Sequence, residues 1–139
     1  MKIQVKRKNK AVWFEAKTEN GNIVEMDGSP DFGGENAGAR PMELLLIGLA
    51  GCSSIDVVSI LKKQRQNLED IQVKVKAERV DEIPAVFSKI HVSFYLYGEI
   101  DENKAQTAVS LSMDKYCSVS KMLAKTATIS YEVVLNPKE

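Results

Sequence analysis

The chain has 139 residues, with 19 Lys and Arg side chains against 19 Asp and Glu, so its formal net charge is zero. This balance argues against a nucleic-acid binder, whose affinity depends on an excess of positive charge facing phosphates. A composition of 44% hydrophobic and 27% charged residues is that of a globular protein, and the length predicts a single domain, 1–139. A domain of this size needs no disulfide to stay folded, so the two cysteines are free for chemistry.

The N-terminal part of the chain predicts short strands followed by a loop. Weak alternation of apolar and polar residues runs through 3–7, 12–16 and 23–26. The last two segments are separated by the turn signal Asn-Gly-Asn at 20–22. Residues 27–40 contain four glycines and show no periodicity, which indicates a loop.

A long helix is predicted from Pro41 to about Lys63. Proline is favoured in a first helical turn, and apolar side chains cover most of the circumference, which is typical of a helix in a core or an interface. The longest apolar stretch, 44–52, is shorter than the ~20 residues of a membrane span, and the first ten residues lack the apolar segment of a signal peptide. We therefore expect a buried helix in a cytoplasmic protein with no membrane partner.

Three further strands are predicted from clear period-two patterns. Alternation over 71–77 and 90–96 indicates two half-buried antiparallel strands, and 129–135 repeats the pattern. The chain then has about six strands in all. Because they cluster instead of alternating strictly with helices, we expect the α+β fold class.

Two helices are expected between the last two of these strands. The first runs from Glu102 to about Ser112 with Asp101 as its cap. The second follows Asp114 as a cap. Its inward-facing residues are expected to be Val119, Met122 and Leu123.

The scarcity of metal-binding residue types excludes most metal and hydrolase chemistry. A zinc site normally needs four ligands from Cys, His or carboxylate, and two cysteines so far apart in the sequence supply no ligand pair. The single histidine, His91, shares a strand face with Ser93 and Tyr95, which favours a sheet-surface residue over a catalytic base. We expect neither a metal nor another cofactor.

Cys52 lies in a stripe of small and polar residues along the long helix. Gly48, Cys52, Asp56 and Ser59 follow one another at spacings of four, four and three, which places them on one side. Such a stripe leaves Cys52 in a groove open to a small molecule or a second thiol. The alternative is a buried, inert cysteine. An ionised, unpaired Asp56 would raise the pKa of the Cys52 thiol, whereas its alternative role is a structural ion pair.

Local electrostatics distinguish the two thiols. If Asp114 is the cap, Cys117 occupies the third helical position, where free backbone N–H groups and the helix dipole favour a thiolate. Cys52 lies about 16 Å beyond Pro41, at a rise of about 1.5 Å per residue, where the dipole has no effect. On this count Cys117 is the better-placed anion.

Two segments carry a resemblance to a known family. Residues 41–58, PMELLLIGLAGCSSIDVV, and 116–123, YCSVSKML, closely resemble the OsmC/Ohr family of thiol-dependent hydroperoxide reductases, in a form similar to its YhfA-like branch. The resemblance covers nearly the whole chain. It implies an OsmC-like fold in which a strongly curved antiparallel sheet wraps a long central helix. It also implies an intertwined homodimer with active sites at the dimer interface.

The same resemblance implies a reaction and its residues. Cys52 is expected to attack the O–O bond of an organic hydroperoxide as the peroxidatic residue and to become a sulfenic acid. Cys117 then resolves it as a Cys52–Cys117 disulfide. An external dithiol reductant, a lipoyl protein in the peroxidase branches, restores both thiols. The resemblance thus implies an activity in the oxidative stress response.

Three supporting residues are expected around the thiols. The acidic residue that follows the family's proline aligns with Met42, one position before Glu43, so Glu43 is a displaced candidate. Arg40 is the nearest candidate for the activating arginine, and Asp56 is the third residue. The alternative function is non-enzymatic: an OsmC-fold protein that binds a small apolar ligand or senses redox state at the dimer interface.

Overall fold

The computed structural model describes residues 1–138, which hold six strands, three α-helices and two shorter helical segments. The chain divides into two compact units, Met1–Leu46 and Ile47–Glu139. The α+β class expected from clustered strands is confirmed. The single domain 1–139 stays a prediction.

The N-terminal unit is a small antiparallel sheet without a hydrophobic core. Strands β1 (Ile3–Arg7), β2 (Phe14–Thr18) and β3 (Ile23–Met26) pair in that order. Gly21 has φ +85°, a conformation that suits the turn predicted between β2 and β3. Among residues 1–46 no hydrophobic side chain is buried. The exposed apolar residues of this unit include Ile3, Val5 and Ile23.

The carboxylate of Asp27 organises the loop after β3. It accepts hydrogen bonds from the backbone N–H groups of Gly28 (2.8 Å), Glu35 (2.9 Å) and Ala37 (3.1 Å). Within the loop, η1 (Pro30–Phe32) forms one 3-10 turn. The bonds from Glu35 and Ala37 are the main cause that lowers the pKa of Asp27, although Asp27 is buried.

The C-terminal unit contains a mixed sheet. Strands β4 (Asn67–Arg79) and β5 (Phe87–Glu99) are antiparallel, as predicted. Strand β6 (Thr128–Leu135) pairs with β5 in parallel, so the expectation of an all-antiparallel sheet is wrong at this strand. The reason is that the connection between β5 and β6 is a helical crossover, which returns the chain in the same direction.

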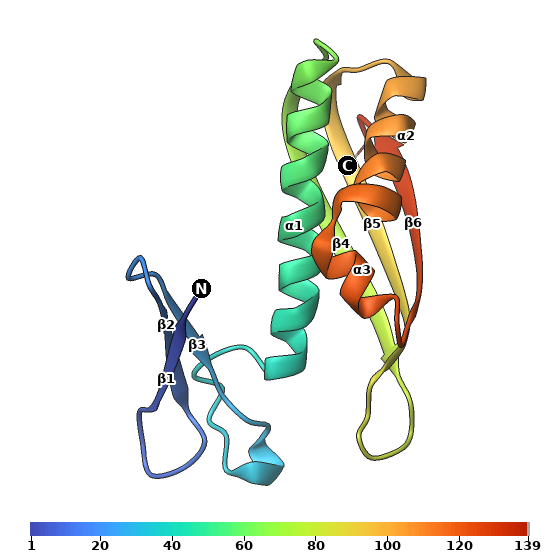
Figure 1. The fold of residues 1–139 in the computed structure, drawn as a ribbon. Coiled ribbons are helices and arrows are strands. Elements are labelled where there is room, and N and C mark those ends of the chain that lie inside the picture. Colours follow the sequence, from blue (N-terminus) through green and yellow to red (C-terminus); the bar gives the residue numbers. More distant parts are fainter. Residues whose placement is uncertain (139) are drawn as a thin grey trace. The chain divides into compact units, whose positions relative to one another are not determined.

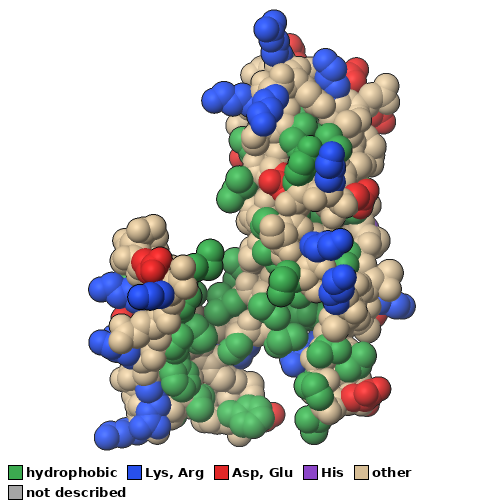
Figure 2. All heavy atoms as spheres, viewed as in Figure 1, with side chains coloured by type: hydrophobic (Ala, Val, Ile, Leu, Met, Phe, Trp, Pro, Cys, Tyr) green, Lys and Arg blue, Asp and Glu red, His purple; other side chains and the backbone are tan. Residues whose placement is uncertain are grey.

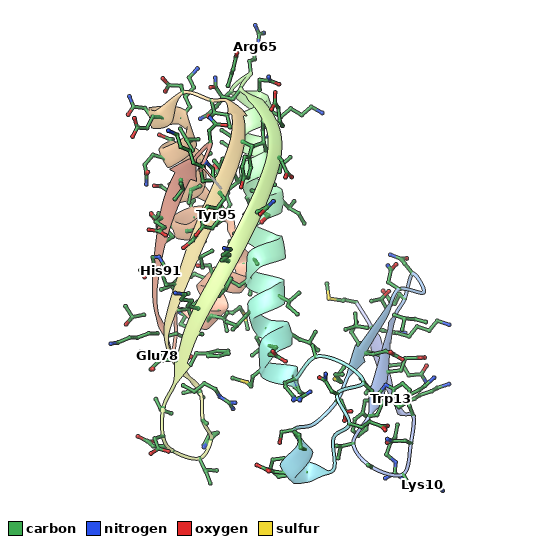
Figure 3. All side chains as sticks on the ribbon, turned by 180° about the vertical axis from the view of Figure 1, so that it is seen from behind. Lys10, Trp13, Arg65, Glu78, His91 and Tyr95 are labelled. Carbon is green, nitrogen blue, oxygen red and sulfur yellow. The ribbon has the colours of Figure 1, made fainter. Side chains whose placement is uncertain are left out.

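Helices cover one face of this sheet. They are α1 (Pro41–Lys63), α2 (Glu102–Leu111) and α3 (Ser118–Leu123), with the π-helical turn η2 (Ser112–Tyr116) between the last two (Figure 1). His91 and Tyr95 lie on the opposite face of the sheet (Figure 3). The fully buried residues of the unit's core include Leu49, Val57, Leu61, Val92, Phe94, Leu96, Ala105, Ala108 and Val109.

Helix α1 has the predicted bounds but is only partly buried. Its buried residues, Leu49, Ser53, Val57 and Leu61, form a single stripe at spacings of four. Its best 18-residue window has a mean hydropathy of 2.1, and only 22% of that window is buried. Length and composition alone give this helix the profile of a membrane span, a profile that core helices of soluble proteins share. The expectation of a buried helix is corrected, since most of its residues are exposed or half-buried in the single chain.

The helices after β5 follow the prediction at first and then depart from it. Helix α2 is capped as expected, since the Asp101 side chain accepts from the Lys104 N–H (3.1 Å). Asp114 caps no helix, because the chain stays helical through η2 and Asp114 instead accepts from the Tyr131 hydroxyl (2.9 Å). The cap of α3 is Cys117, and Met122 is 74% exposed instead of facing inward.

Candidate functional site

Helix α1 places Cys52 and Asp56 one turn apart on the same side. Both side chains are half-buried. Between them, Ser53 is fully buried, and its hydroxyl donates to the carbonyl oxygen of Leu49 (2.8 Å) inside the helix. A second element approaches α1 at the Ser53 carbonyl oxygen and at Asp56.

The approaching element is the π-helical turn η2 and the start of α3. The Cys117 N–H donates to the Ser112 carbonyl oxygen (2.7 Å), which closes the wide turn, and the Cys117 sulfur accepts from the Ser120 N–H (3.4 Å). The Cys117 side chain is only 3% exposed. Turns of this kind are frequent at functional sites because they redirect side chains within a helix.

The two cysteines and Asp56 form one cluster. The Sγ atoms of Cys52 and Cys117 and a carboxylate oxygen of Asp56 all lie within 4.8 Å of one another, and both cysteines are free thiols. The expectation that two distant cysteines supply no ligand pair is therefore wrong. Sequence separation was a poor guide because the crossover after β5 returns the chain to α1.

A serine hydroxyl holds the carboxylate of the cluster in place. Ser112 Oγ lies 3.2 Å from Asp56 Oδ2 and 3.0 Å from the carbonyl oxygen of Ser53. Ser112 is fully buried, so its hydroxyl needs these partners. None of the ion pairs of residues 1–138 involves Asp56, so the structural ion pair considered for Asp56 from the sequence is not formed. Its carboxylate has the Ser112 hydroxyl as a partner instead.

The environment of Cys117 favours the thiol over the thiolate. Burial is the main cause that raises the pKa of Cys117 to about 11; the neighbouring Cys52 thiol also acts to raise it, whereas the hydrogen bond from the Ser120 N–H acts to lower it. The expectation that Cys117 is the better-placed anion is therefore wrong. Desolvation outweighs the N-terminus of α3, which is only six residues long.

A pocket of about 270 Å³ adjoins Cys117. Lys115 and Lys121 bring positive charge to its lining. The Tyr131 hydroxyl, also in the lining, is tied to Asp114. A molecule that enters this pocket would therefore reach the Cys117 thiol past both apolar and positively charged side chains. The other lining residues are Met113, Asp114, Ser120, Ala124 and Ile129.

Glu43 and Arg40 have local roles at the start of α1. The Glu43 carboxylate accepts from the Arg40 N–H (2.8 Å), as in a capping box. The guanidinium of Arg40 donates through Nη1 to the Gly38 carbonyl oxygen (3.3 Å). Both residues belong to the N-terminal unit, whereas the thiol cluster is built within the C-terminal unit. Their roles as supporting residues stay predictions.

Two serines of the site were missed in the sequence. Ser112 and Ser120 orient Asp56 and Cys117, but a serine in a helical segment carries no distinguishing signal. His91 lies on the far sheet face, where Nδ1 is 2.7 Å from Ser130 Oγ and Nε2 is 3.8 Å from Glu132 (Figure 3).

Comparisons with known proteins agree with this geometry. A family model described as OsmC-like protein matches residues 33–132. Protein YhfA of Escherichia coli K12 is 43% identical over 124 residues, which cover 87% of this chain and 90% of that protein. The crystal structure of a hypothetical protein from Aquifex aeolicus VF5 is also similar. Its sequence is 32% identical, and its TM-score is 0.81 over 98% of this chain and 97% of that one.

A third similar structure carries a functional title. An organic hydroperoxide resistance protein OsmC from Legionella pneumophila, also titled a predicted redox protein, is 18% identical. Its TM-score is 0.67 over 96% of each chain, a likeness of fold. OsmC-like proteins are generally soluble, which favours reading the apolar α1 as a helix of a soluble protein. The family match over most of the chain and the 43% identity to YhfA place this protein in the OsmC-like family, in its YhfA-like branch.

Proposed function

We propose that the protein is a Cys-based peroxidase that reduces organic hydroperoxides. The observation that carries the proposal is the approach of the two thiols: Cys52 Sγ and Cys117 Sγ lie within 4.8 Å of each other. A small movement brings them to the bonding distance of a disulfide, about 2.05 Å. The similarity of fold to a protein titled an organic hydroperoxide resistance protein supports the same chemistry.

Burial and charge support Cys52 as the residue that attacks peroxide. Cys52 is half-buried and thus reachable, whereas Cys117 is 3% exposed and its pKa is raised to about 11. The thiolate is the nucleophile, so a thiol that stays protonated at neutral pH is the poorer attacking group. Cys117 is accordingly assigned the resolving role.

The reaction balances as a two-electron reduction. The Cys52 thiolate attacks one peroxide oxygen, the O–O bond breaks, and Cys52 becomes a sulfenic acid while the alkoxide takes a proton and leaves as an alcohol. Cys117 sulfur then attacks Cys52 sulfur, forming the disulfide and releasing water. An external dithiol exchanges with this disulfide, is itself oxidised, and restores both thiols. The pocket beside Cys117 is a route for that dithiol.

The proposal includes a homodimer, because each unit leaves apolar residues exposed. On α1, Ile47 is 57% and Ile55 is 71% exposed, and Figure 2 shows hydrophobic side chains on the surface around this helix. The N-terminal sheet exposes Ile3 and Val5 and has no core of its own. A second copy of the chain supplies the missing cover for both surfaces. We place this dimer in the cytoplasm, where thiols are kept reduced.

Thiol consumption tests the peroxidase. The protein, reduced and kept anaerobic, is mixed with one equivalent of cumene hydroperoxide or linoleic acid hydroperoxide, and free thiols are counted over time. Loss of both thiols of each chain within minutes, with one alcohol formed per peroxide, is expected. Unchanged thiols over the same period would contradict the proposal.

A non-enzymatic role is the second candidate, and Asp56 is the observation that favours it. A carboxylate oxygen of Asp56 lies within 4.8 Å of both sulfurs, whereas reactive cysteines are usually found in electropositive surroundings. A slow thiol pair suits a redox sensor or a site for a small apolar ligand. A double variant, Cys52→Ser with Cys117→Ser, separates the two roles. Thermal stabilisation of this variant by an apolar compound supports binding, whereas no shift with any compound of a screen argues against it.

A further inference from the structure

The side chains of the thiol cluster are suited to metal coordination as well as to redox chemistry. Cys52 and Cys117 supply two sulfur atoms and Asp56 supplies a carboxylate oxygen, all within 4.8 Å of one another. In tetrahedral coordination with Zn–S bonds of about 2.3 Å, two sulfurs lie about 3.8 Å apart. The two sulfurs, at most 4.8 Å apart, therefore need to close by about one ångström or less to share a single ion.

The type of donor selects the type of ion. Two thiolates and one carboxylate carry three negative charges, of which a borderline-soft divalent cation offsets two, whereas Mg²⁺ and Ca²⁺ require more oxygen ligands than the cluster contains. Three protein ligands leave a fourth position for water, the pattern of an open zinc site. The half-burial of Cys52 and Asp56 gives an ion access to the cluster.

The cluster also has outer partners that orient its donors. Ser112 Oγ lies 3.2 Å from Asp56 Oδ2, and the Ser120 N–H donates to Cys117 Sγ (3.4 Å). Hydrogen bonds of this kind fix the direction of ligand atoms in metal sites. They hold Asp56 and Cys117 in place whether or not an ion is present.

We propose that the reduced protein binds one Zn²⁺ ion per chain through Cys52, Asp56 and Cys117. Binding replaces the two thiol protons, so that one Zn²⁺ enters and two H⁺ leave, and the affinity increases with pH. The site needs only reduced thiols. It therefore goes beyond the peroxidase proposal and does not depend on it.

Cobalt provides the direct probe of this site. Co²⁺ is titrated into reduced, metal-free protein under anaerobic conditions, and the absorption spectrum is followed. One Co²⁺ per chain is expected, with sulfur-to-cobalt charge-transfer bands and the intense visible bands of tetrahedral cobalt. Added Zn²⁺ should displace it with the stoichiometry of one ion per chain.

Variants assign the spectrum to the cluster. Cys52→Ser and Cys117→Ser should each remove part of the charge-transfer absorption. Ser112→Ala should keep the bands but weaken Co²⁺ binding by about ten- to hundredfold, because Ser112 orients a ligand without being one. His91→Gln, which removes the only histidine of the chain, is the matched control and should leave the titration unchanged.

Two results would overturn the site. One is a wild-type cobalt complex without sulfur charge-transfer bands, and the other is Co²⁺ binding that is unaffected by Cys52→Ser. If Cys117→Ser does not fold by circular dichroism, Asp56→Asn takes its place and should weaken binding without loss of sulfur bands. If the protein binds Zn²⁺ but does not consume peroxide, the zinc site is supported and only the peroxidase proposal is contradicted.

Discussion

The sulfur of Cys117 lies within 4.8 Å of the sulfur of Cys52, although two long strands and two helical segments separate the residues along the chain. The approach is possible because η2 carries Ser112 and Cys117 to the small-residue side of α1, where Ser112 Oγ is 3.0 Å from the carbonyl oxygen of Ser53. Both proposals for this protein depend on that approach. The predictions below test its parts separately.

The two thiols should differ in their roles toward peroxide. Cys52→Ser is expected to abolish peroxide consumption, because the accessible nucleophile is removed. Cys117→Ser should allow one turnover that ends at a sulfenic acid on Cys52, since the resolving thiol is missing. Dimedone labelling followed by mass spectrometry of the peptides identifies the site. A rapid reaction in Cys52→Ser, with dimedone on Cys117, would reverse the assignment.

Alkylation should also distinguish the thiols in the absence of any peroxide. At neutral pH, iodoacetamide is expected to modify Cys52 well before Cys117, because Cys117 is 3% exposed and its pKa is raised to about 11 by burial. Peptide mass spectrometry over a time course measures both rates. In denaturant the two rates should converge, which is the control, and equal rates in the folded protein would contradict the burial of Cys117.

The stability of the N-terminal unit should fall in acid because of Asp27. Hydrogen bonds lower the pKa of Asp27 from its ordinary value of 3.8, so its stabilising effect is complete above that value and is lost as the pH falls through the lower, folded-state pKa. In Asp27→Asn this part of the acid dependence should be absent. The variant should also be less stable at pH 7, because one amide oxygen cannot replace both carboxylate oxygens.

Fluorescence of Trp13 measures this effect in the unit concerned. Trp13 is the only tryptophan of the chain and lies within the same unit as Asp27. Urea unfolding followed at this signal from pH 7 to pH 3 should show a steeper loss of stability in the wild type than in Asp27→Asn. Parallel curves for the two proteins would show that Asp27 is not the titrating group.

The glycines of α1 test whether a second copy packs against this helix. In the single chain nothing lies within 4 Å of a Cβ added at Gly48 or Gly51. Gly48→Ala should therefore stabilise an isolated chain by about 1 kcal/mol through helix propensity alone. In the proposed dimer, Gly48→Leu should instead weaken association, because it adds bulk where the partner approaches.

Sedimentation velocity over a range of concentrations measures that association. The matched control is Lys63→Leu, which adds the same side chain to the exposed last turn of the same helix and should leave the dimer intact. A wild type that is monomeric at nanomolar concentration with unchanged near-ultraviolet circular dichroism would contradict the dimer. Equal dissociation constants for wild type and Gly48→Leu would contradict close packing at Gly48.

Local patterns were sufficient for most secondary structure. Alternation predicted the strands, Pro41 and the apolar run predicted α1, and Asp101 predicted the start of α2, since each signal depends on residues within one or two turns. The same approach failed at Asp114. It looks like a helix cap in sequence, but its carboxylate is used by Tyr131 of a distant strand. The parallel direction of β6 likewise depends on the path of a crossover.

The family and the identity of the two cysteines were available from the sequence, because short motifs on one helix and at one helix start carry them. That the two cysteines meet was expected only from the family resemblance, and the part played by Ser112 was not expected at all, because no local pattern reports that η2 packs against α1. The protonation of Cys117 was predicted with the wrong sign for the same reason. A helix N-terminus is visible in sequence, whereas the desolvation that raises the pKa of Cys117 to about 11 exists only once the chain has folded around it.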